Sequence, residues 1–504
     1  GVINIISRKA SKPGDQVSAT LSGGSYHTFR QNIGLTGRRK GFNYSAGYTH
    51  LSSDGFSAAY DEQGTGGYDK DGINQHSAQA RLGFDLNNRL HLNVNGSYSY
   101  YRADLDASAF TDEKDFSVKN DNGQAGAGLV YDHTRGSLRF NYLFNYVERR
   151  YLDDSIYKSS PYVDYSRSRF IGRTHFAEVY NNWKWNKLDV LVGLDFRFNN
   201  TDQYYFSTGP FGPYEPPVLN NKMSQVSPYA SLAWRELKGF QFEAGARWNR
   251  HSEYGSNFTF NLNPSYRAGQ TKLFANFYTA FKAPTLYQLF DPAAGNKDLE
   301  PEKGWIGEAG VEFFTQSTFN TRITGFYRNT KNSIQYITID PVNFFSQYRN
   351  VSQQLNYGFE WELSYTPGKF NLTSNFTYTD GRTTSPYDGT GAPLGKDTTY
   401  FDLYRIPKLA LNLQFGYQFT NAWYARMQLR AVSEREEFIY GASPETLDGY
   451  ATVDLYGEYR FNKAWRAFVD LRNITDTKYF DIRGYNARRF NFAAGVTINF
   501  ARKG

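Results

Sequence analysis

The chain has 504 residues, including 41 tyrosines, 41 phenylalanines and 8 tryptophans, and its net charge is +7. Its mean hydropathy is −0.64, and it has no uninterrupted apolar stretch of about 18 residues, which excludes a helical membrane protein. It has no cysteine, which excludes thiolate-ligated metal sites, and its 56 basic residues are dispersed among 49 acidic ones, which argues against nucleic-acid binding.

Alternating apolar and polar residues predict β-strands along the whole chain. Leu188–Phe198 has Leu, Val or Phe at every second position, with Asp189, Asp195 and Arg197 among the residues between them. Phe240–Trp248 and Lys408–Phe419 repeat this alternation. Many of these segments are as long as the roughly 9–11 residues of a tilted membrane strand, whereas globular strands usually have about 5–6. Strands of this length and pattern favour a membrane barrel over a soluble sandwich.

The charged face of each strand decides which side faces lipid, because a charge at the lipid midplane costs about 2–4 kcal/mol. Open sheet edges cannot exist in lipid, so the sheet must close. We therefore predict an all-β fold, a transmembrane antiparallel β-barrel of about 22 strands. The residues expected to face lipid include Leu411, Leu413, Phe415, Val496 and Ile498, and those expected to face the lumen include Asp189, Arg197, Glu243 and Arg247.

The connections between the predicted strands alternate between short and long. Short periplasmic turns and long outer loops are typical of outer-membrane barrels. The expected long loops are 55–74, 104–121, 153–171, 203–223, 283–302, 332–350, 384–404, 436–448 and 475–489. The short connections include 37–41, 86–89, 133–136, 185–187 and 420–422.

Four segments resemble parts of TonB-dependent receptors. The first residues, GVINIISRK, resemble the last strand of the plug domain of that family. Phe281–Lys303, FKAPTLYQLFDPAAGNKDLEPEK, resembles a loop motif of the family, although Lys282 and Lys297 replace the usual Arg and Pro. Leu471–Tyr479, LRNITDTKY, resembles the late Asn-Leu-x-Asp-x-x-Tyr motif, and the last strand alternates to Phe500 like a C-terminal assembly signal.

The resemblance implies a domain organisation and a way of working. Residues 1–15 would be the end of the plug domain and its linker, and residues 16–504 the transmembrane β-barrel. We expect the rest of the plug upstream in a longer precursor, or supplied separately. The resemblance further implies a receptor of the Gram-negative outer membrane, in contact with its lipids, that is not an enzyme. The TonB complex would act through the plug to import a scarce, bulky nutrient. We also consider a capping surface lipoprotein as a partner.

The order of the loops most resembles that of cobalamin receptors. Gly66–Gly72, GGYDKDG, resembles the Asp-x-Asp-Gly calcium loop of that subfamily, although Gly67 stands where an amide ligand is expected. The tripeptide at 105–107, Leu-Asp-Ala, resembles a Tyr-Asp-Ala segment that binds calcium and touches the ligand. Calcium prefers several carboxylate oxygens around a tight turn. The resemblance implies calcium ligands at Asp69, Asp71 and Asp106, with Asp54 and Asp115 as neighbouring candidates, and a ligand contact at Ala107.

Two further residues are predicted to face the ligand, and three other functions are considered beside cobalamin import. Arg405 and Phe438 fall where the cobalamin subfamily carries residues that face the corrinoid. Import of a ferric siderophore is the main alternative, because aromatic residues at 204–206 and at 344, 345 and 348 would suit such a ligand. The haem receptors of the family carry an axial His in the loop that corresponds to 281–303, which here has none. A passive porin would be favoured by 16–18 strands.

Overall fold

The computed structural model describes residues 13–157, 160–315, 318–340, 342–343, 345–388, 391–401, 403–437, 439 and 444–502, with the backbone alone at 236–237. Of the segment 1–15, which was expected to be the end of the plug domain and its linker, residues 1–12 lie outside these residues. The first half of the barrel wall consists of β1 (Gly14–Gly24), β2 (Thr28–Arg39), β3 (Phe42–Ser53), β4 (Ile73–Asp85), β5 (Leu90–Asp104), β6 (Phe116–His133), β7 (Gly136–Asp153), β8 (Tyr165–Lys184), β9 (Leu188–Thr208), β10 (Leu219–Leu237), β11 (Phe240–His251) and β12 (Gly255–Ala268). The second half consists of β13 (Thr271–Lys282), β14 (Glu302–Thr315), β15 (Phe319–Asp340), β16 (Phe345–Tyr365), β17 (Phe370–Tyr387), β18 (Pro393–Tyr400), β19 (Leu409–Gln418), β20 (Trp423–Val432), β23 (Tyr450–Arg460), β24 (Trp465–Arg472) and β25 (Asn491–Arg502). A small hairpin, β21 (Arg435–Glu437) and β22 (Glu445–Leu447), and one short helix, α1 (Leu286–Phe290), lie in the connections.

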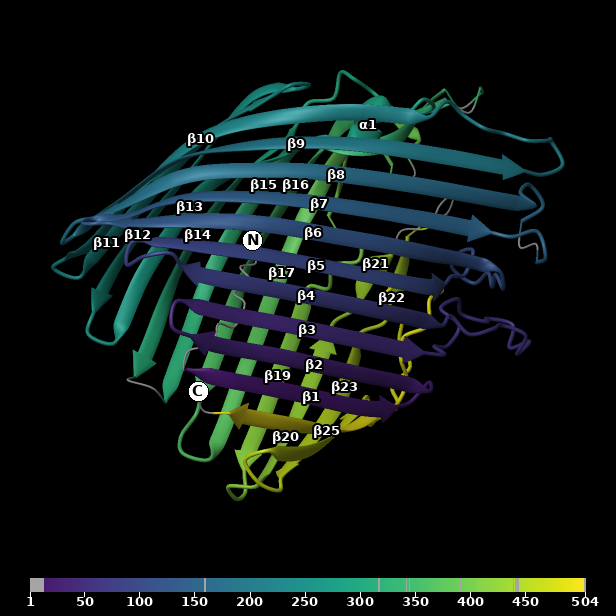
Figure 1. The fold of residues 1–504 in the computed structure, drawn as a ribbon. Helices are drawn as coiled ribbons and strands as arrows, with labels where there is room; N and C mark the ends of the chain where they lie inside the picture. The colour runs from purple at the N-terminus through teal and green to yellow at the C-terminus, as the bar shows by residue number, and fades with distance from the viewer. Residues whose placement is uncertain are drawn as a thin grey trace.

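The strands close into one antiparallel barrel, as predicted (Figure 1). The first strand pairs with β2 on one edge and with the last strand, β25, on the other, where Leu21 lies opposite Val496. β18 and β19 both pair with the same edge of β17, so together they form one interrupted strand. The wall therefore has 22 strands, as the sequence predicted.

The two faces of the wall separate apolar from polar residues. Leu413 on β19 lies opposite Leu429 on β20, whereas the next position pairs Gln414 with Gln428. The apolar face carries many of the large, solvent-exposed hydrophobic side chains of the described residues, as expected for a barrel whose outer surface meets lipid. The opposite face carries Asp189, Arg197, Glu243 and Arg247, which share it through cross-strand partners on β9, β10 and β11.

The connections at the two ends of the barrel differ in length as predicted, but several of the long loops are shorter than predicted. The loop predicted at 203–223 spans only 209–218, and the loop predicted at 332–350 spans only 341–344, because the flanking strands continue to pair. β8, β9, β15 and β16 have 20, 21, 22 and 21 residues, about twice what the bilayer needs. Backbone groups above the membrane still gain from pairing, so a strand has no reason to end at the bilayer surface.

The loop between β13 and β14, which carries the first family motif, is a compact structural element. Thr285 caps α1 in a capping box with Gln288, and Pro284 is fully buried. The side-chain amide of Asn296 donates to the backbone oxygen of Tyr348 at 2.9 Å, which holds the loop against the β15–β16 hairpin. Among the described residues, no helix is long and apolar enough to cross a membrane.

Candidate functional site in the outer loops

Three outer loops from the two ends of the chain are joined above the seam between β25 and β1. Ala59, in the β3–β4 loop, forms an isolated bridge with Tyr485, in the β24–β25 loop. The backbone oxygen of Gly484 accepts hydrogen bonds from the amides of Tyr60 at 2.9 Å and Phe110 at 3.1 Å. Phe110 belongs to the β5–β6 loop, so the loops 54–72, 105–115 and 473–490 form one continuous wall, which we call the seam wall.

Two further contacts hold the seam wall together. The side-chain amide of Asn486 donates to the backbone oxygens of Ser57 and Ala59 at 3.0 and 2.8 Å. The ammonium of Lys478 lies 2.6 Å from the hydroxyl of Tyr60 and also faces its ring. These contacts join residues more than 400 positions apart in the chain.

An acidic cluster occupies the base of the seam wall. Carboxylate oxygens of Asp69, Asp106 and Asp112 all lie within 4.8 Å of one another. Asp71 contacts Asp106, and we count it in the cluster. Backbone amides hold these two carboxylates in place: Ala58 donates to Asp71, and Ala59 donates to Asp106. The carboxylate of Asp112 accepts from the backbone amide of Asp69 at 3.0 Å, which ties the two loops together.

Burial and neighbouring negative charges raise the pKa values of two carboxylates of the cluster. Burial, reinforced by the nearby charges of Asp112 and Asp106, raises the pKa of Asp69 to about 6. Burial and the contact with Asp106 raise the pKa of Asp71 to about 7, against the opposing hydrogen bond from Ala58. Both shifts reflect carboxylates that repel one another in a partly dry site.

The cluster fits a calcium ion by its chemistry. One oxygen each of Asp69 and Asp71 is buried without a hydrogen-bond partner. Hard cations such as Ca²⁺ take about six to eight oxygen ligands, and they stabilise neighbouring carboxylates that would otherwise repel one another. Asp69 and Asp106 belong to one group of carboxylates, and Asp71 contacts Asp106. The three ligands expected from the sequence therefore lie together.

The sequence analysis missed Asp112, which belongs to the same group. It follows Asp106 by six positions in the segment DASAFTD, and only the folded loop brings the two carboxylates together. A second acidic group, Glu113, Asp115 and Asp153, lies at the tops of β6 and β7. Of the two neighbouring candidates, Asp115 is part of this second group, and Asp54 instead contacts the ring of His27 at 2.5 Å.

The three residues predicted to contact the imported ligand lie in three different surroundings. Ala107 is exposed on the seam wall beside Asp106, where a bound molecule can reach it. Arg405 lies in the segment between β18 and β19 and donates to the buried carboxylate of Glu437 at 2.7 Å, while its own side chain stays half exposed. Phe438 lies outside the described residues.

The aromatic residues expected to suit a siderophore do not form one cluster in the part of the chain that the structure describes, which leaves out Phe344. Tyr204 and Phe206 lie on the outward face of β9, opposite Arg169 and Arg167 of β8. Tyr348 instead packs beside Tyr287 in the α1 loop. Strand periodicity sends alternate residues to opposite faces, so a run of adjacent aromatics cannot line one pocket.

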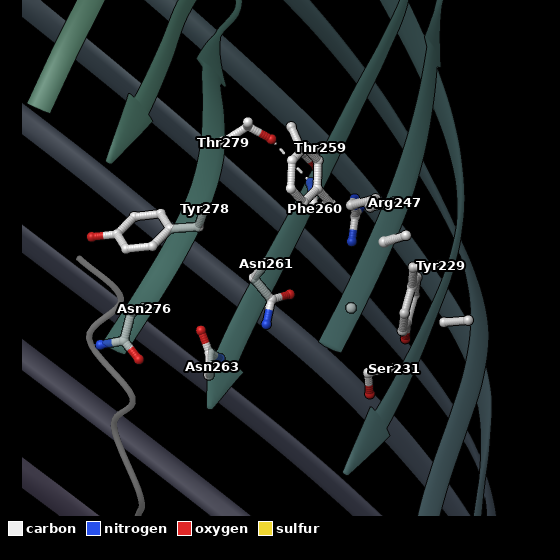
Figure 2. Close-up of a pocket in the computed structure, with 13 residues that line it drawn as sticks. Tyr229, Ser231, Arg247, Thr259, Phe260, Asn261, Asn263, Asn276, Tyr278 and Thr279 are labelled. Carbon is white, nitrogen blue, oxygen red and sulfur yellow. Dashed lines mark hydrogen bonds between the residues drawn. The ribbon is translucent and has the colours of Figure 1, made fainter. Parts of the chain in front are cut away.

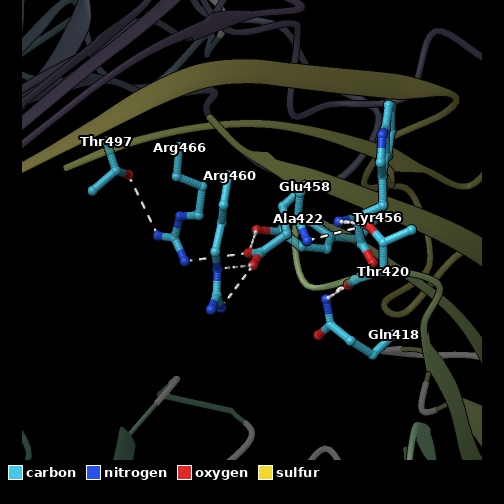
Figure 3. Close-up of polar contacts among 9 residues, drawn as sticks. Gln418, Thr420, Ala422, Tyr456, Glu458, Arg460, Arg466 and Thr497 are labelled. Carbon is cyan, nitrogen blue, oxygen red and sulfur yellow. Dashed lines mark hydrogen bonds and ion pairs between the residues drawn. The ribbon is translucent and has the colours of Figure 1, made fainter. Parts of the chain in front are cut away.

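The lumen wall below the loops is polar and hollowed. A hollow of about 580 Å³ lies on this wall, and its lining includes Tyr229, Arg247, Asn261 and Tyr278 on β10 to β13. Figure 2 shows these side chains. Nearer the short turns, Glu458 accepts hydrogen bonds from Arg460 and Arg466 (Figure 3). A polar, charged lumen suits a plug or a hydrophilic solute rather than lipid.

The family model described as TonB dependent receptor-like, beta-barrel matches residues 16–474. The chain belongs to this family. A vitamin B12 transporter of Photobacterium profundum is 24% identical to it over 99% of this chain and 76% of that protein. A ferric enterobactin receptor of Pseudomonas aeruginosa is 24% identical over 48% of this chain and 36% of that protein.

Solved structures share the fold at low identity. A copper transporter, OprC, superposes with a TM-score of 0.80 at 14% identity, covering 98% of this chain and 82% of that one. A ferric enterobactin receptor of Pseudomonas aeruginosa superposes with a TM-score of 0.79 at 17% identity, covering 99% and 82%. Members of this receptor family are outer-membrane transporters and receptors, not enzymes.

Proposed function

We propose that this TonB-dependent receptor lies in the Gram-negative outer membrane and imports a corrinoid of the cobalamin class. The observation that carries the proposal is the match to a vitamin B12 transporter along 99% of the chain, whereas the ferric enterobactin receptor matches only 48%. The acidic cluster supports it, because the three carboxylates expected from the likeness to cobalamin receptors lie together at the base of the seam wall.

In this proposal the seam wall forms one side of the binding cup. Ca²⁺ held by Asp69, Asp71 and Asp106 would offset the repulsion among these carboxylates and so order the loops that carry Ala107. The hydrogen bonds between loops 54–72 and 473–490 would then hold the cup in one shape. The barrel is the rigid wall, and TonB would supply the energy for import by acting on a plug.

Binding titrations test the proposal. We expect cobalamin to bind the detergent-solubilised receptor in millimolar calcium, and to bind more weakly in chelator. Asp71→Asn should remove this dependence on calcium. Glu62→Gln is the matched control, because Glu62 lies in the same loop, is exposed and has the same charge. Binding of a ferric catecholate with no binding of cobalamin would refute the corrinoid proposal and leave the family assignment intact.

Import of a ferric siderophore is the second candidate. It is favoured by the superposition on siderophore receptors at TM-scores of 0.77 and 0.79. These likenesses have identities of 16% and 17%, so they support the fold rather than the ligand. A passive porin is disfavoured by the 22 strands of the wall, since porins have about 16–18.

A further inference from the structure

The outward face of β5 to β9 changes from apolar to charged at one level. On β7 the outward residues Phe140 and Tyr142 lie opposite apolar residues of β8, whereas Glu148 and Arg150 follow nearer the outer loops. On β9 the outward residues change in the same way, from Phe196 and Phe198 to charged and polar groups. This level is where the outer surface of a membrane barrel passes from hydrocarbon to headgroups.

Four cations stand side by side just above that level. The register places Arg102 of β5 opposite Lys119 of β6, Lys119 opposite Arg150 of β7, and Arg150 opposite Arg169 of β8. Strands are about 4.8 Å apart, so the row is roughly 14 Å long. Like charges directly opposite one another destabilise a sheet. All four side chains are exposed on the outer face, so the row needs anions near it.

The carboxylates of the sheet neutralise only part of this charge. Glu148 lies 2.9 Å from Arg150 and 2.7 Å from Arg169, and Asp121 lies 2.9 Å from Arg150. Arg102 reaches Asp104 only at 3.6 Å. Among the described residues, no carboxylate pairs with Lys119.

Arg167, one position above the row on β8, extends the excess of positive charge. Its guanidinium lies 5.2 Å from the centre of the Phe206 ring, and no carboxylate in the described part of the chain pairs with it. The outer basic patch, as we call it, consists of Arg102, Lys119, Arg150, Arg167 and Arg169. Its five cations have only Asp104, Asp121 and Glu148 as carboxylates beside them in the part of the chain that the structure describes.

We propose that the outer basic patch binds the phosphorylated headgroup of a lipid in the outer leaflet. The patch faces away from the lumen, so a transported solute does not reach it. Its height beside the apolar band is that of headgroups. Phosphate is the anion that suits it best, because guanidinium groups bind phosphate oxygens in pairs and lysine adds a point charge. The lipid would replace the repulsion along the row with ion pairs and fix the barrel in the membrane. The proposal rests on the outer-membrane location alone and not on the imported ligand.

The test measures lipid retained by the receptor. Lipopolysaccharide is the probe, its enzymatically dephosphorylated form is the first control, and inorganic phosphate is the second. We expect the receptor to retain the phosphorylated lipid through detergent washing, and to retain little of the dephosphorylated form. Inorganic phosphate should not displace the lipid at equal phosphate concentration, because a free ion lacks the acyl chains. Equal retention of both forms, or displacement by inorganic phosphate, would overturn the proposal.

Variants separate this patch from general surface charge. The triple variant Arg102→Gln, Lys119→Gln, Arg167→Gln leaves both arginines on Glu148, so the sheet keeps its closest ion pairs. We expect it to retain about tenfold less phosphorylated lipid. The control variant Lys303→Gln, Lys331→Gln, Arg382→Gln removes the same charge from the outward face of β14, β15 and β17. An equal loss in the control would show that charge alone matters and would refute a specific site. Cobalamin binding by both variants shows that the barrel has folded. If cobalamin does not bind the unmodified receptor, resistance of the barrel to unfolding in detergent shows the same.

Discussion

Asp71→Asn should make the acidic loops stable without calcium. The pKa of Asp71 is raised from 3.8 to about 7, so its ionised form is disfavoured in the folded loop. At about 1.4 kcal/mol for each pKa unit, a shift of roughly three units corresponds to about 4 kcal/mol as an upper limit. Asp71 is only half-buried, so screening by solvent reduces this to about 1–2 kcal/mol. Asn keeps the acceptor for the amide of Ala58 but removes the charge.

The sign of the pH effect follows from the direction of the shift. A raised pKa means that ionisation destabilises the folded loop, fully so above about pH 7, and that this penalty shrinks progressively as the pH falls below about 7 for Asp71 and about 6 for Asp69. In chelator, loops 54–72 and 105–115 should therefore be better ordered at pH 5.5 than at pH 8, values that bracket these two pKa values. Calcium at about 100 times its dissociation constant should add roughly 2.7 kcal/mol at pH 8.

Amide hydrogen exchange at Ala58 and Ala59 measures the effect, because these two amides donate to Asp71 and Asp106. At pH 8, calcium should slow their exchange by up to about 100-fold, after correction for the intrinsic rates. In chelator, Asp71→Asn should slow it by about 5–30-fold, and calcium should add little. Glu62→Gln should behave like the unmodified receptor. Identical exchange in chelator and in calcium would refute the reasoning, because it would show an acidic cluster that holds no ion.

Three further predictions address the wall, the loops and the lumen. Leu413→Arg should destabilise the barrel in vesicles by about 2–4 kcal/mol in denaturant titrations, whereas Gln414→Arg should cost little because that face meets water. Reversed costs would contradict the assigned faces. Arg405→Ala should destabilise the receptor by about 1–3 kcal/mol, because it leaves the buried carboxylate of Glu437 without its guanidinium. In the Glu437→Gln variant, the same Arg405→Ala change should cost much less. Full additivity of the two changes would exclude this ion pair as the cause. In planar bilayers, the chain by itself should conduct ions as a large, unselective pore, and a closed barrel would show that its own segments block the lumen.

The sequence by itself determined the architecture, because a membrane barrel imposes a period of two on every strand. Alternation in segments such as Lys408–Phe419 identified the lipid and lumen faces, and the number and spacing of such segments predicted 22 strands. The likeness of the Asp-Lys-Asp-Gly turn to cobalamin receptors predicted a shared role for Asp69 and Asp71 in an acidic loop. These features are local, so they can be read along the chain.

The tertiary structure decided what depends on contacts between distant segments. Asp112 joins Asp69 only because loops of two different hairpins fold against each other, and Ala59 meets Tyr485 only because the barrel closes its first strand on its last. Strand length above the membrane was also undetermined, since polar residues in a paired hairpin look like those in a loop. The row of Arg102, Lys119, Arg150 and Arg169 depends on cross-strand register, and register is a property of the closed sheet rather than of any one strand.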